Sequence, residues 1–265
     1  RQAFIARFND DGSLDTTFNS TGHLRFNPGN PGTSEGNSVF ILADGKILVA
    51  GEAYYTPSLD NDFFIARFDE DGSFDTSFDG DGVVFTDVRG TGVSKDFMQS
   101  AAISIDEKVT AIGQSDFGDG TKYLAAVRYN TNGSLDTSFN GTGRYTSYPT
   151  SWGVVTAMTT QSDNKVVVVG LEMIRLTSSG AVDSSFSANG GLALQLDGNP
   201  FYANSIIQQY NGKLVLAGYI YDGVESKFTL ARYESGQLDT DFDGYIDSLD
   251  NCQSIANEDQ TDTDL

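Results

Sequence analysis

The sequence has little proline, a single cysteine and no long apolar run. Of its 265 residues only 5 are Pro, and Cys252 is the one Cys, so no disulfide can close within the chain. No stretch reaches the roughly 18 consecutive apolar residues that a membrane-spanning helix needs. No long segment repeats its apolar residues with the 3.6-residue period of a helix. These absences favour a fold built from strands.

Positive charge is scarce as well. The chain carries 37 acidic and 16 basic residues and a formal net charge of −21. Such a surface repels nucleic acid and anionic membranes, so we expect no nucleic-acid partner and no membrane insertion. It attracts hard cations, Ca²⁺ above all, because they prefer carboxylate oxygen. Solubility in a salty medium is the alternative explanation for most of the acids.

One segment of the sequence returns several times, and a period of this length is typical of repeat architectures. Each copy contains, in this order, an Arg, a turn with Gly, an Asp, and a Phe three residues after the Asp. The Gly residues of successive copies lie 60, 61, 47 and 56 residues apart. The copies span residues 4–18, 64–78, 126–139, 175–186 and 232–242.

A second motif alternates with the first and consists of a turn, a Lys, a β-branched run and a Gly. Its copies span residues 46–51, 108–113, 165–170 and 213–218. A short strand precedes each copy, and hairpin-turn residues such as Asp44-Gly45 separate the two. One period therefore predicts four short antiparallel strands, the content of a propeller blade. We predict an all-β fold, a β-propeller of four-stranded antiparallel blades; a β-sandwich or an open β-solenoid is the alternative.

The predicted blades do not close into a ring of complete units. Residues 38–87, 99–147 and 155–195 form three complete blades, residues 1–27 a half blade, and residues 203–233 a three-stranded one. Blades missing upstream, pairing of the terminal strands, and completion of blades between molecules are three explanations. The chain also begins without Met or a signal-peptide pattern, so we expect a removed leader or an excised piece of a longer protein.

The repeat resembles the delta-60 repeat family of bacterial surface and secreted proteins. The resemblance rests on Arg, Asp-Gly-Ser-Leu-Asp-Thr-Ser-Phe and Gly-Lys-Ile-Leu-Val-Ala-Gly, and it covers residues 1–238, which we treat as one propeller domain. It implies an extracellular, propeller-like module and no particular reaction. The fourth copy, with Ser178-Ser179-Gly180, departs most from the pattern, which leaves the geometry of its turn in doubt.

Arg and Asp recur eight residues apart in four copies and seven apart in the fifth. The pairs are Arg7 with Asp15, Arg67 with Asp75, Arg128 with Asp136, Arg175 with Asp183, and Arg232 with Asp239. A ring of charged functional sites is one interpretation. We favour a structural pairing that fixes the turn after the third strand, because an active site seldom needs five copies. We expect the Phe that ends each copy to pack between blades.

From Asp239 onward the sequence becomes acidic. Counted from Asp239, acids occupy positions 1, 3, 5, 9 and 12 and Gly244 occupies position 6, which is the spacing of an EF-hand loop. Alternate oxygens surround one ion, the Gly permits a sharp turn, and a backbone carbonyl at position 7 adds a ligand. The predicted calcium ligands are Asp239, Asp241, Asp243, Tyr245, Asp247 and Asp250. An acidic disordered linker is the alternative.

Residues 239–265 also resemble the thrombospondin type 3 repeat, through Asp250-Asn-Cys252 and the acids that follow. The resemblance implies Ca²⁺ as cofactor and a disulfide from Cys252 to a Cys beyond residue 265. It also implies the start of a second metal site at Asp259, Asp262 and Asp264. We treat these residues as a truncated calcium-binding segment.

No convincing catalytic set emerges from the sequence, so we predict a protein that is not an enzyme. We expect a structural or adhesive module of a secreted or cell-surface bacterial protein that binds Ca²⁺ and contacts other surface proteins or copies of itself, head to tail. The alternative is a propeller that binds a ligand such as a glycan, or a propeller lyase or hydrolase. Its candidate residues, all expected in loops, are Tyr54, Tyr55, Trp152 and Tyr221.

Overall fold

The computed structural model describes residues 1–29, 33–55, 60–90, 94–118, 120–147, 155–187, 191–196 and 198–236, apart from the Tyr55 side chain. The chain divides into two compact units, residues 1–150 and 151–265. The described residues form strands and turns without a helix, as the sequence predicts. Among them there is accordingly no helix with the length and apolarity to cross a membrane.

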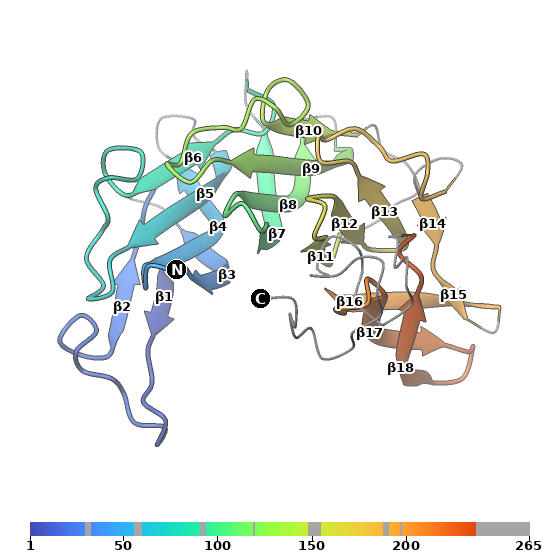
Figure 1. Ribbon diagram of the computed structural model, residues 1–265, viewed down its shortest axis with the longest axis horizontal. Helices are drawn as coiled ribbons and strands as arrows, with labels where there is room; N and C mark the ends of the chain where they lie inside the picture. The colour runs from blue at the N-terminus through green and yellow to red at the C-terminus, as the bar shows by residue number, and fades with distance from the viewer. Residues whose placement is uncertain are drawn as a thin grey trace, which may run out of the picture. The chain divides into compact units, whose positions relative to one another are not determined.

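The first unit contains a two-stranded half blade and two four-stranded antiparallel blades, whose strands run in sequence order across each sheet (Figure 1). The half blade consists of β1 (Ala3–Ala6) and β2 (His23–Phe26). The next blade contains β3 (Ser34–Ile41), β4 (Ile47–Tyr55), β5 (Asp60–Phe68) and β6 (Val83–Thr86). The third contains β7 (Lys95–Ile103), β8 (Val109–Asp116), β9 (Lys122–Tyr129) and β10 (Arg144–Thr146).

The second unit contains two further four-stranded sheets. The first contains β11 (Ala157–Thr160), β12 (Val166–Val169), β13 (Glu172–Leu176) and β14 (Gly191–Ala193). The last contains β15 (Gln195–Leu196), β16 (Asn199–Gln208), β17 (Leu214–Tyr221) and β18 (Ser226–Tyr233). The short β15 pairs with β16, so β18 is the outer strand of this sheet among the described residues. The sequence predicted β16–β18 as a three-stranded blade and missed β15.

The Gly that ends three of the four β-branched runs has a steric cause. A β-bulge lies in the neighbouring strand opposite Gly51, Gly113 and Gly218. A Cβ on Gly113 would lie 2.0 Å from the carbonyl oxygen of Phe97, and a Cβ on Gly218 would lie 1.9 Å from that of Tyr202. Only Gly lets the bulged backbone approach this closely. The strands that carry these bulges, β3, β7 and β16, also begin earlier than predicted, at Ser34, Lys95 and Asn199.

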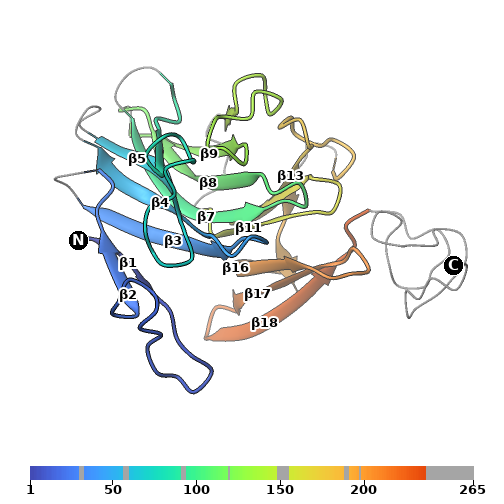
Figure 2. The same ribbon diagram turned by 60° about the vertical axis from the view of Figure 1, so that its left-hand side comes forward.

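Apolar side chains on the broad faces of the sheets bury against the neighbouring blade. Between the half blade and the next blade, Phe64 and Phe68 are fully buried in one cluster with Ile5 and Phe26. Between the second and third blades, Phe63 and Ile65 pack in a cluster with residues of β7, β8 and β9. Full burial of one such side chain contributes about 1.5–3 kcal/mol to folding. The views in Figures 1 and 2 show the sheets of this unit packed face to face.

Candidate functional site

The first four copies of the first motif, which the structure describes, fold into the same compact turn between the third and fourth strands of their blades. In the second blade, β5 ends at Phe68, residues 69–72 form a tight turn, and the chain returns through Asp75 to Phe78 before β6. Backbone bonds from Gly72 N to Asp69 O and from Phe78 N to Asp75 O hold this path. We call the group of Arg67, Asp75, Ser77 and Phe78, with its equivalents in other blades, the Arg corner.

The carboxylate at the centre of the Arg corner is surrounded by donors. Asp75 Oδ1 accepts hydrogen bonds from the backbone N (3.0 Å) and the hydroxyl (2.6 Å) of Ser77. Asp75 Oδ2 receives Arg67 Nε at 2.6 Å and Lys46 Nζ at 2.8 Å. Lys46 is the residue that opens the second sequence motif, so the two motifs meet at this carboxylate. Both oxygens of Asp75 are thereby engaged within the blade itself.

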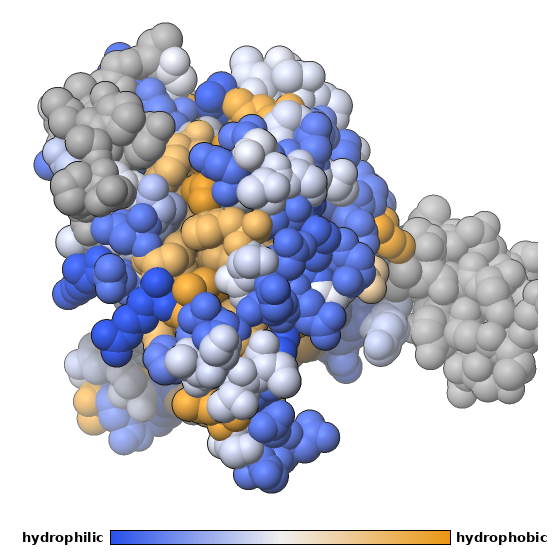
Figure 3. Space-filling view, turned by 90° about the vertical axis from the view of Figure 1, so that its left-hand side faces the viewer, coloured by the Kyte–Doolittle hydropathy of each residue, from blue (hydrophilic) through white to orange (hydrophobic). Residues whose placement is uncertain are grey.

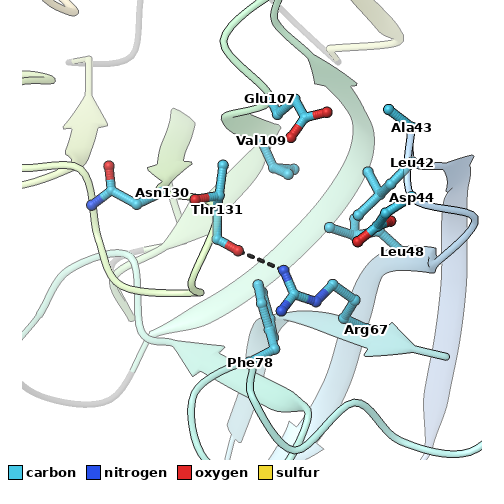
Figure 4. A pocket seen from close by; sticks show the side chains of 10 residues that line it. All are labelled: Leu42, Ala43, Asp44, Leu48, Arg67, Phe78, Glu107, Val109, Asn130 and Thr131. Carbon is cyan, nitrogen blue, oxygen red and sulfur yellow. Dashed lines mark hydrogen bonds between the residues drawn. The ribbon is translucent and has the colours of Figure 1, made fainter.

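The guanidinium of Arg67 also reaches the next blade. Its Nη1 donates a hydrogen bond of 2.6 Å to the backbone oxygen of Thr131, in the corresponding turn of the third blade (Figure 4). The Arg67 guanidinium also lies over the Phe78 ring, 4.7 Å from its centroid. Beside it, Asp79 N donates to Asn132 O at 3.1 Å, and the Phe78 ring would meet a Cβ on Gly133 at 3.1 Å. The Arg corner therefore locks one blade onto the turn of the next.

The same arrangement recurs in the other copies. The Arg Nε to Asp Oδ2 distances are 2.7 Å for Arg7 and Asp15, 2.7 Å for Arg128 and Asp136, and 2.8 Å for Arg175 and Asp183. Arg7 donates to the backbone oxygen of Glu70, and Arg175 to that of Ser235. The fourth corner keeps this geometry although its turn sequence departs from the pattern, so doubt about that turn was misplaced. In the fifth copy, Asp239 lies outside the described residues.

These hydrogen bonds decide how the carboxylates titrate. Burial alone would raise the pKa of Asp75, but hydrogen bonds from Lys46, Ser77 and Arg67 outweigh it and lower the pKa well below its usual value. Burial opposes hydrogen bonds from Ser138 and Lys108 in the same way at Asp136, whose pKa is also lowered. These acids therefore remain ionised at neutral pH and are poorly suited to transfer protons.

A small cavity lies beside the second Arg corner, and its lining includes Leu42, Leu48, Arg67, Phe78 and Val109 (Figure 4). Its volume is about 140 Å³. Ligand sites of drug size need roughly 300 Å³ or more, so this cavity has room for water or a small ion. The corner thus has the geometry of a structural lock.

A different set of acids lies at the opposite end of the same strands, where β5 begins, β6 ends and β7 begins. We call Asp60, Asp62, Asp87 and Asp96 the acidic end. Asp60, Asp62 and Asp96 are 5%, 2% and 0% exposed. Asp96 Oδ2 accepts a hydrogen bond from Val88 N at 2.7 Å, and its Oδ1 accepts one from the Ser115 hydroxyl. Neutral amide and hydroxyl groups are thus the donors to Asp96.

The donors to Asp96 are neutral, and its pKa shifts in the opposite direction from the pKa values of the acids in the Arg corners. Burial, helped by the nearby charges of Asp87 and Asp62, raises the pKa of Asp96 to about 7 although the hydrogen bonds from Ser115 and Val88 act to lower it. Glu52, whose Oε2 accepts a 2.6 Å hydrogen bond from Met98 N of the next blade, also has its pKa raised to about 7 by burial. Perturbed acids of this kind occur at functional sites as well as in structural networks.

Several predicted site residues can now be placed. The predicted calcium ligands from Asp239 to Asp250, the second set from Asp259 to Asp264, and Cys252 all lie outside the described residues, as does Trp152. Tyr54 and Tyr55 belong to β4 and Tyr221 ends β17, so the prediction that these three lie in loops was wrong. β4 and β17 continue past Gly51 and Gly218, the residues at which the second motif ends. Within the described residues, no three His, Cys, Asp or Glu side chains are arranged to hold a metal ion.

Two features escaped the sequence interpretation. Gly32-Thr-Ser34-Glu-Gly36 has the Gly-x-Ser-x-Gly spacing of a hydrolase nucleophile turn. However, Ser34 is 1% exposed, and its hydroxyl accepts a hydrogen bond from Ala3 N at 3.0 Å, so it joins β3 to the half blade. The acidic end was missed because its members come from β5, from β7 and from the residue after β6, and do not recur in every repeat.

The comparisons with known proteins agree with this architecture. Residues 1–18, 42–78, 106–139 and 161–186 match the family model described as a domain of unknown function (DUF5122) β-propeller. The four matched segments contain the four Arg corners. The chain is therefore an all-β protein of propeller blades, built from a propeller-like repeat. A comparison with curated proteins finds no match.

Solved structures with a similar fold have low sequence identity to the chain. A protein of unknown function from Bacteroides caccae shares 13% identity over 89% of this chain and 70% of its own, with a TM-score of 0.49. A gluconolactonase from Xanthomonas campestris shares 14% identity over 80% of this chain and 61% of its own (TM-score 0.43). The GH93 α-L-arabinofuranosidase of Fusarium graminearum shares 10% identity over 80% of this chain and 62% of its own, with a TM-score of 0.48. The chain spans about three fifths of the length of these two enzymes, and such a likeness carries no information about activity.

Proposed function

We propose that the chain is a non-enzymatic structural module of a secreted or cell-surface bacterial protein, whose acidic C-terminal segment binds Ca²⁺. One observation carries the structural part: the charged residues of the repeat are engaged with one another and with the next blade. Asp75 accepts hydrogen bonds from three side chains and one backbone amide, and Arg67 spans the blade boundary. Residues held in this way stabilise a scaffold.

The calcium part rests on the chemistry of the donor set. Five carboxylates and a backbone carbonyl are hard oxygen donors, and the alternation of Asp239, Asp241 and Asp243 before Gly244 suits the coordination of Ca²⁺. The ion would be held by these residues with Tyr245, Asp247 and Asp250, and its charge would offset the repulsion between the acids. Asp259, Asp262 and Asp264 would begin a second site of the same chemistry.

Calorimetric titration of the full chain with CaCl₂ tests this assignment. We expect saturable binding that the Asp241→Ala/Asp243→Ala double variant loses by at least about tenfold in affinity, because two ligands of one ion are removed. Asp10→Ala/Glu70→Ala is the matched control, since it removes the same charge from exposed turns of the repeat. Equal binding by the two double variants would show that Ca²⁺ responds only to net charge.

A carboxylate-based hydrolase or lyase is the second candidate function. The observation in its favour is the raised pKa of Asp96 and Glu52, both near the value that proton transfer at neutral pH requires. Against it, the Asp96 side chain is 0% exposed and accepts its hydrogen bonds from the protein itself. Turnover of a glycoside or lactone that Asp96→Asn abolishes, in a variant with unchanged unfolding, would establish this second candidate.

A further inference from the structure

The repeat allows a surface of the first or the last described blade to be compared with its buried equivalent in a blade between them. β1 corresponds to β5, because Phe8 forms the same bridge to Leu14 as Phe68 forms to Phe74. Phe4 and Phe8 are therefore the equivalents of Phe64 and Phe68. The inner pair is 0% exposed, whereas Phe4 is 56% and Phe8 is 61% exposed.

The turn of the half blade shows the same difference. In the second blade, the Phe18 ring lies 2.9 Å from where a Cβ of Gly72 would be, and in the third blade Phe78 lies 3.1 Å from the equivalent point on Gly133. Among the described residues, no atom lies within 4 Å of that point on Gly12. We call Phe4, Phe8 and the Gly12 turn the head face. It is the receiving half of the interface between blades.

The last sheet presents the other half of that interface. Arg232 pairs with Val215 as Arg67 pairs with Leu48, which makes Phe228 and Leu230 the equivalents of Phe63 and Ile65. The inner residues are 0% exposed and pack on the next blade, whereas Phe228 is 78% and Leu230 is 63% exposed. We call Phe228, Leu230 and Arg232 the tail face. Exposed aromatic and aliphatic residues gathered on a strand of this kind mark an interaction surface.

We propose that the tail face of one copy of the chain binds the head face of a second copy. Both halves of this contact already occur within the molecule, where a surface of the tail type buries against one of the head type at each blade boundary of the first unit. In the assembly, Phe228 and Leu230 bury against Phe4 and Phe8, and Arg232 reaches the turn that precedes Gly12, as Arg67 reaches the turn that precedes Gly133. The contact is heterologous, so it propagates from copy to copy.

The surface around β1 has the shape to receive a partner. Figure 3 shows the side of the molecule that carries the half blade, where apolar side chains form a band with hydrophilic margins. Hollows of about 580 Å³ and 210 Å³ lie there, and Phe4 lines both of them. Val39 and Ile41 of the neighbouring β3 are 58% and 68% exposed and extend the apolar surface. With a net charge of −21 per copy, an apolar contact of this kind strengthens when salt screens the repulsion between copies.

Sedimentation velocity of the full chain and two blocked variants tests the proposal. Phe4→Glu/Phe8→Glu blocks the head face and Phe228→Glu/Leu230→Glu blocks the tail face; all four positions are exposed, so both variants are expected to fold. The wild-type chain should form a concentration-dependent series of multiples of 28.5 kDa, with more of the larger species at high salt. Each blocked variant alone should remain at 28.5 kDa.

A mixture of the two blocked variants is the decisive sample. Each retains one intact face, so the mixture should form dimers and nothing larger. A symmetric contact between like faces would instead let the variant that keeps that face dimerise on its own. Val224→Glu, at a position 86% exposed outside the tail face, is the control and should assemble like the wild type. A wild-type chain that stays a monomer at every concentration, or blocked variants that still assemble, would overturn the proposal. Calcium titration of the same samples keeps the proposed function separate, because a monomer that binds Ca²⁺ contradicts only the assembly.

Discussion

The two ends of the strands in the first unit hold buried acids in opposite ways. At the Arg corners, Asp75 and Asp136 accept hydrogen bonds from Arg and Lys, and their pKa values are lowered. At the acidic end, Asp96 accepts hydrogen bonds from an amide and hydroxyls, and its pKa is raised to about 7. A buried acid is thus a permanent anion at one end, where cations donate to it, and a carboxyl that titrates near neutrality at the other, where burial is deeper and the donors are neutral.

The difference shows what the repeat provides. The first motif supplies the Arg, the Asp and the Ser or Thr, and at the second, third and fourth corners the second motif adds a Lys. The repeat thus brings the cations to these carboxylates. The acidic end takes its acids from loops and strand ends that vary between repeats. At the Arg corners, which the repeat builds, cations and hydroxyl groups compensate the burial of the carboxylates. At the acidic end, which the repeat does not build, burial raises the pKa of Asp96.

The largest expected effect is at the third Arg corner. Asp136→Ala leaves the guanidinium of Arg128 buried beside a missing carboxylate; both side chains are 6% exposed in the native chain. We expect a loss of about 3 kcal/mol in unfolding free energy, measured by urea denaturation, because an uncompensated buried charge is costly. Glu225→Ala, which removes an exposed ion pair with Lys227, is the control and should cost less than about 1 kcal/mol. Equal losses would contradict the buried lock.

A smaller effect with the opposite sign is expected at the acidic end. The folded-state pKa of Asp96, about 7, lies above the roughly 3.9 of an unfolded Asp, so the folded state binds more protons between these values. Its contribution to stability is therefore present at low pH and is lost as pH rises toward 7. Asp96→Asn stays neutral, and we expect its stability relative to the wild type to improve by about 2 kcal/mol from pH 5 to pH 8.

Urea denaturation at several pH values measures this difference. Asp75→Asn is the matched comparison, because its carboxylate has a lowered pKa and contributes stability that is lost only as the pH falls below the usual Asp value. Its stability relative to the wild type should therefore stay constant over the same range. An Asp96→Asn curve parallel to the wild-type curve would remove the difference between the two ends.

Much of the fold follows from the sequence because the repeat makes each local pattern visible several times. The four-stranded blade predicted over residues 38–87 contains β4, β5 and β6 and the second half of β3, and the eight-residue spacing predicted the pairing of Arg67 with Asp75. The early starts of β3 and β7 were missed, since polar residues such as Glu35 and Lys95 conceal strands whose pairing is set by the neighbouring strand. In these strands the backbone pairing extends beyond the residues whose apolar pattern identifies the strand in the sequence.

The candidate site was only partly predictable for a related reason. The Arg corner is local, so spacing along one segment reveals it. The bond from Arg67 to Thr131 crosses 64 residues, and the hydrogen bond from Ser94 N to Asp60 crosses 34, so neither leaves a signal in a single sequence. The exposure of Phe4 and Phe228 also depends on the position of their blades, the first and the last of the described residues, because the equivalent Phe64 and Phe63 are buried.

Amide hydrogen exchange in Arg67→Lys tests most directly whether the Arg corner locks one blade to the next. The Lys keeps the charge but cannot reach Asp75, Ser77 and Thr131 together. We predict that the Asp79 amide, which donates across the blade boundary to Asn132 O at 3.1 Å, exchanges about tenfold faster, as a loss of about 1.4 kcal/mol implies, while amides within β4 keep their protection. Unchanged exchange at the Asp79 amide would contradict a lock between blades, because the Arg corner would then stabilise only the turn that contains it.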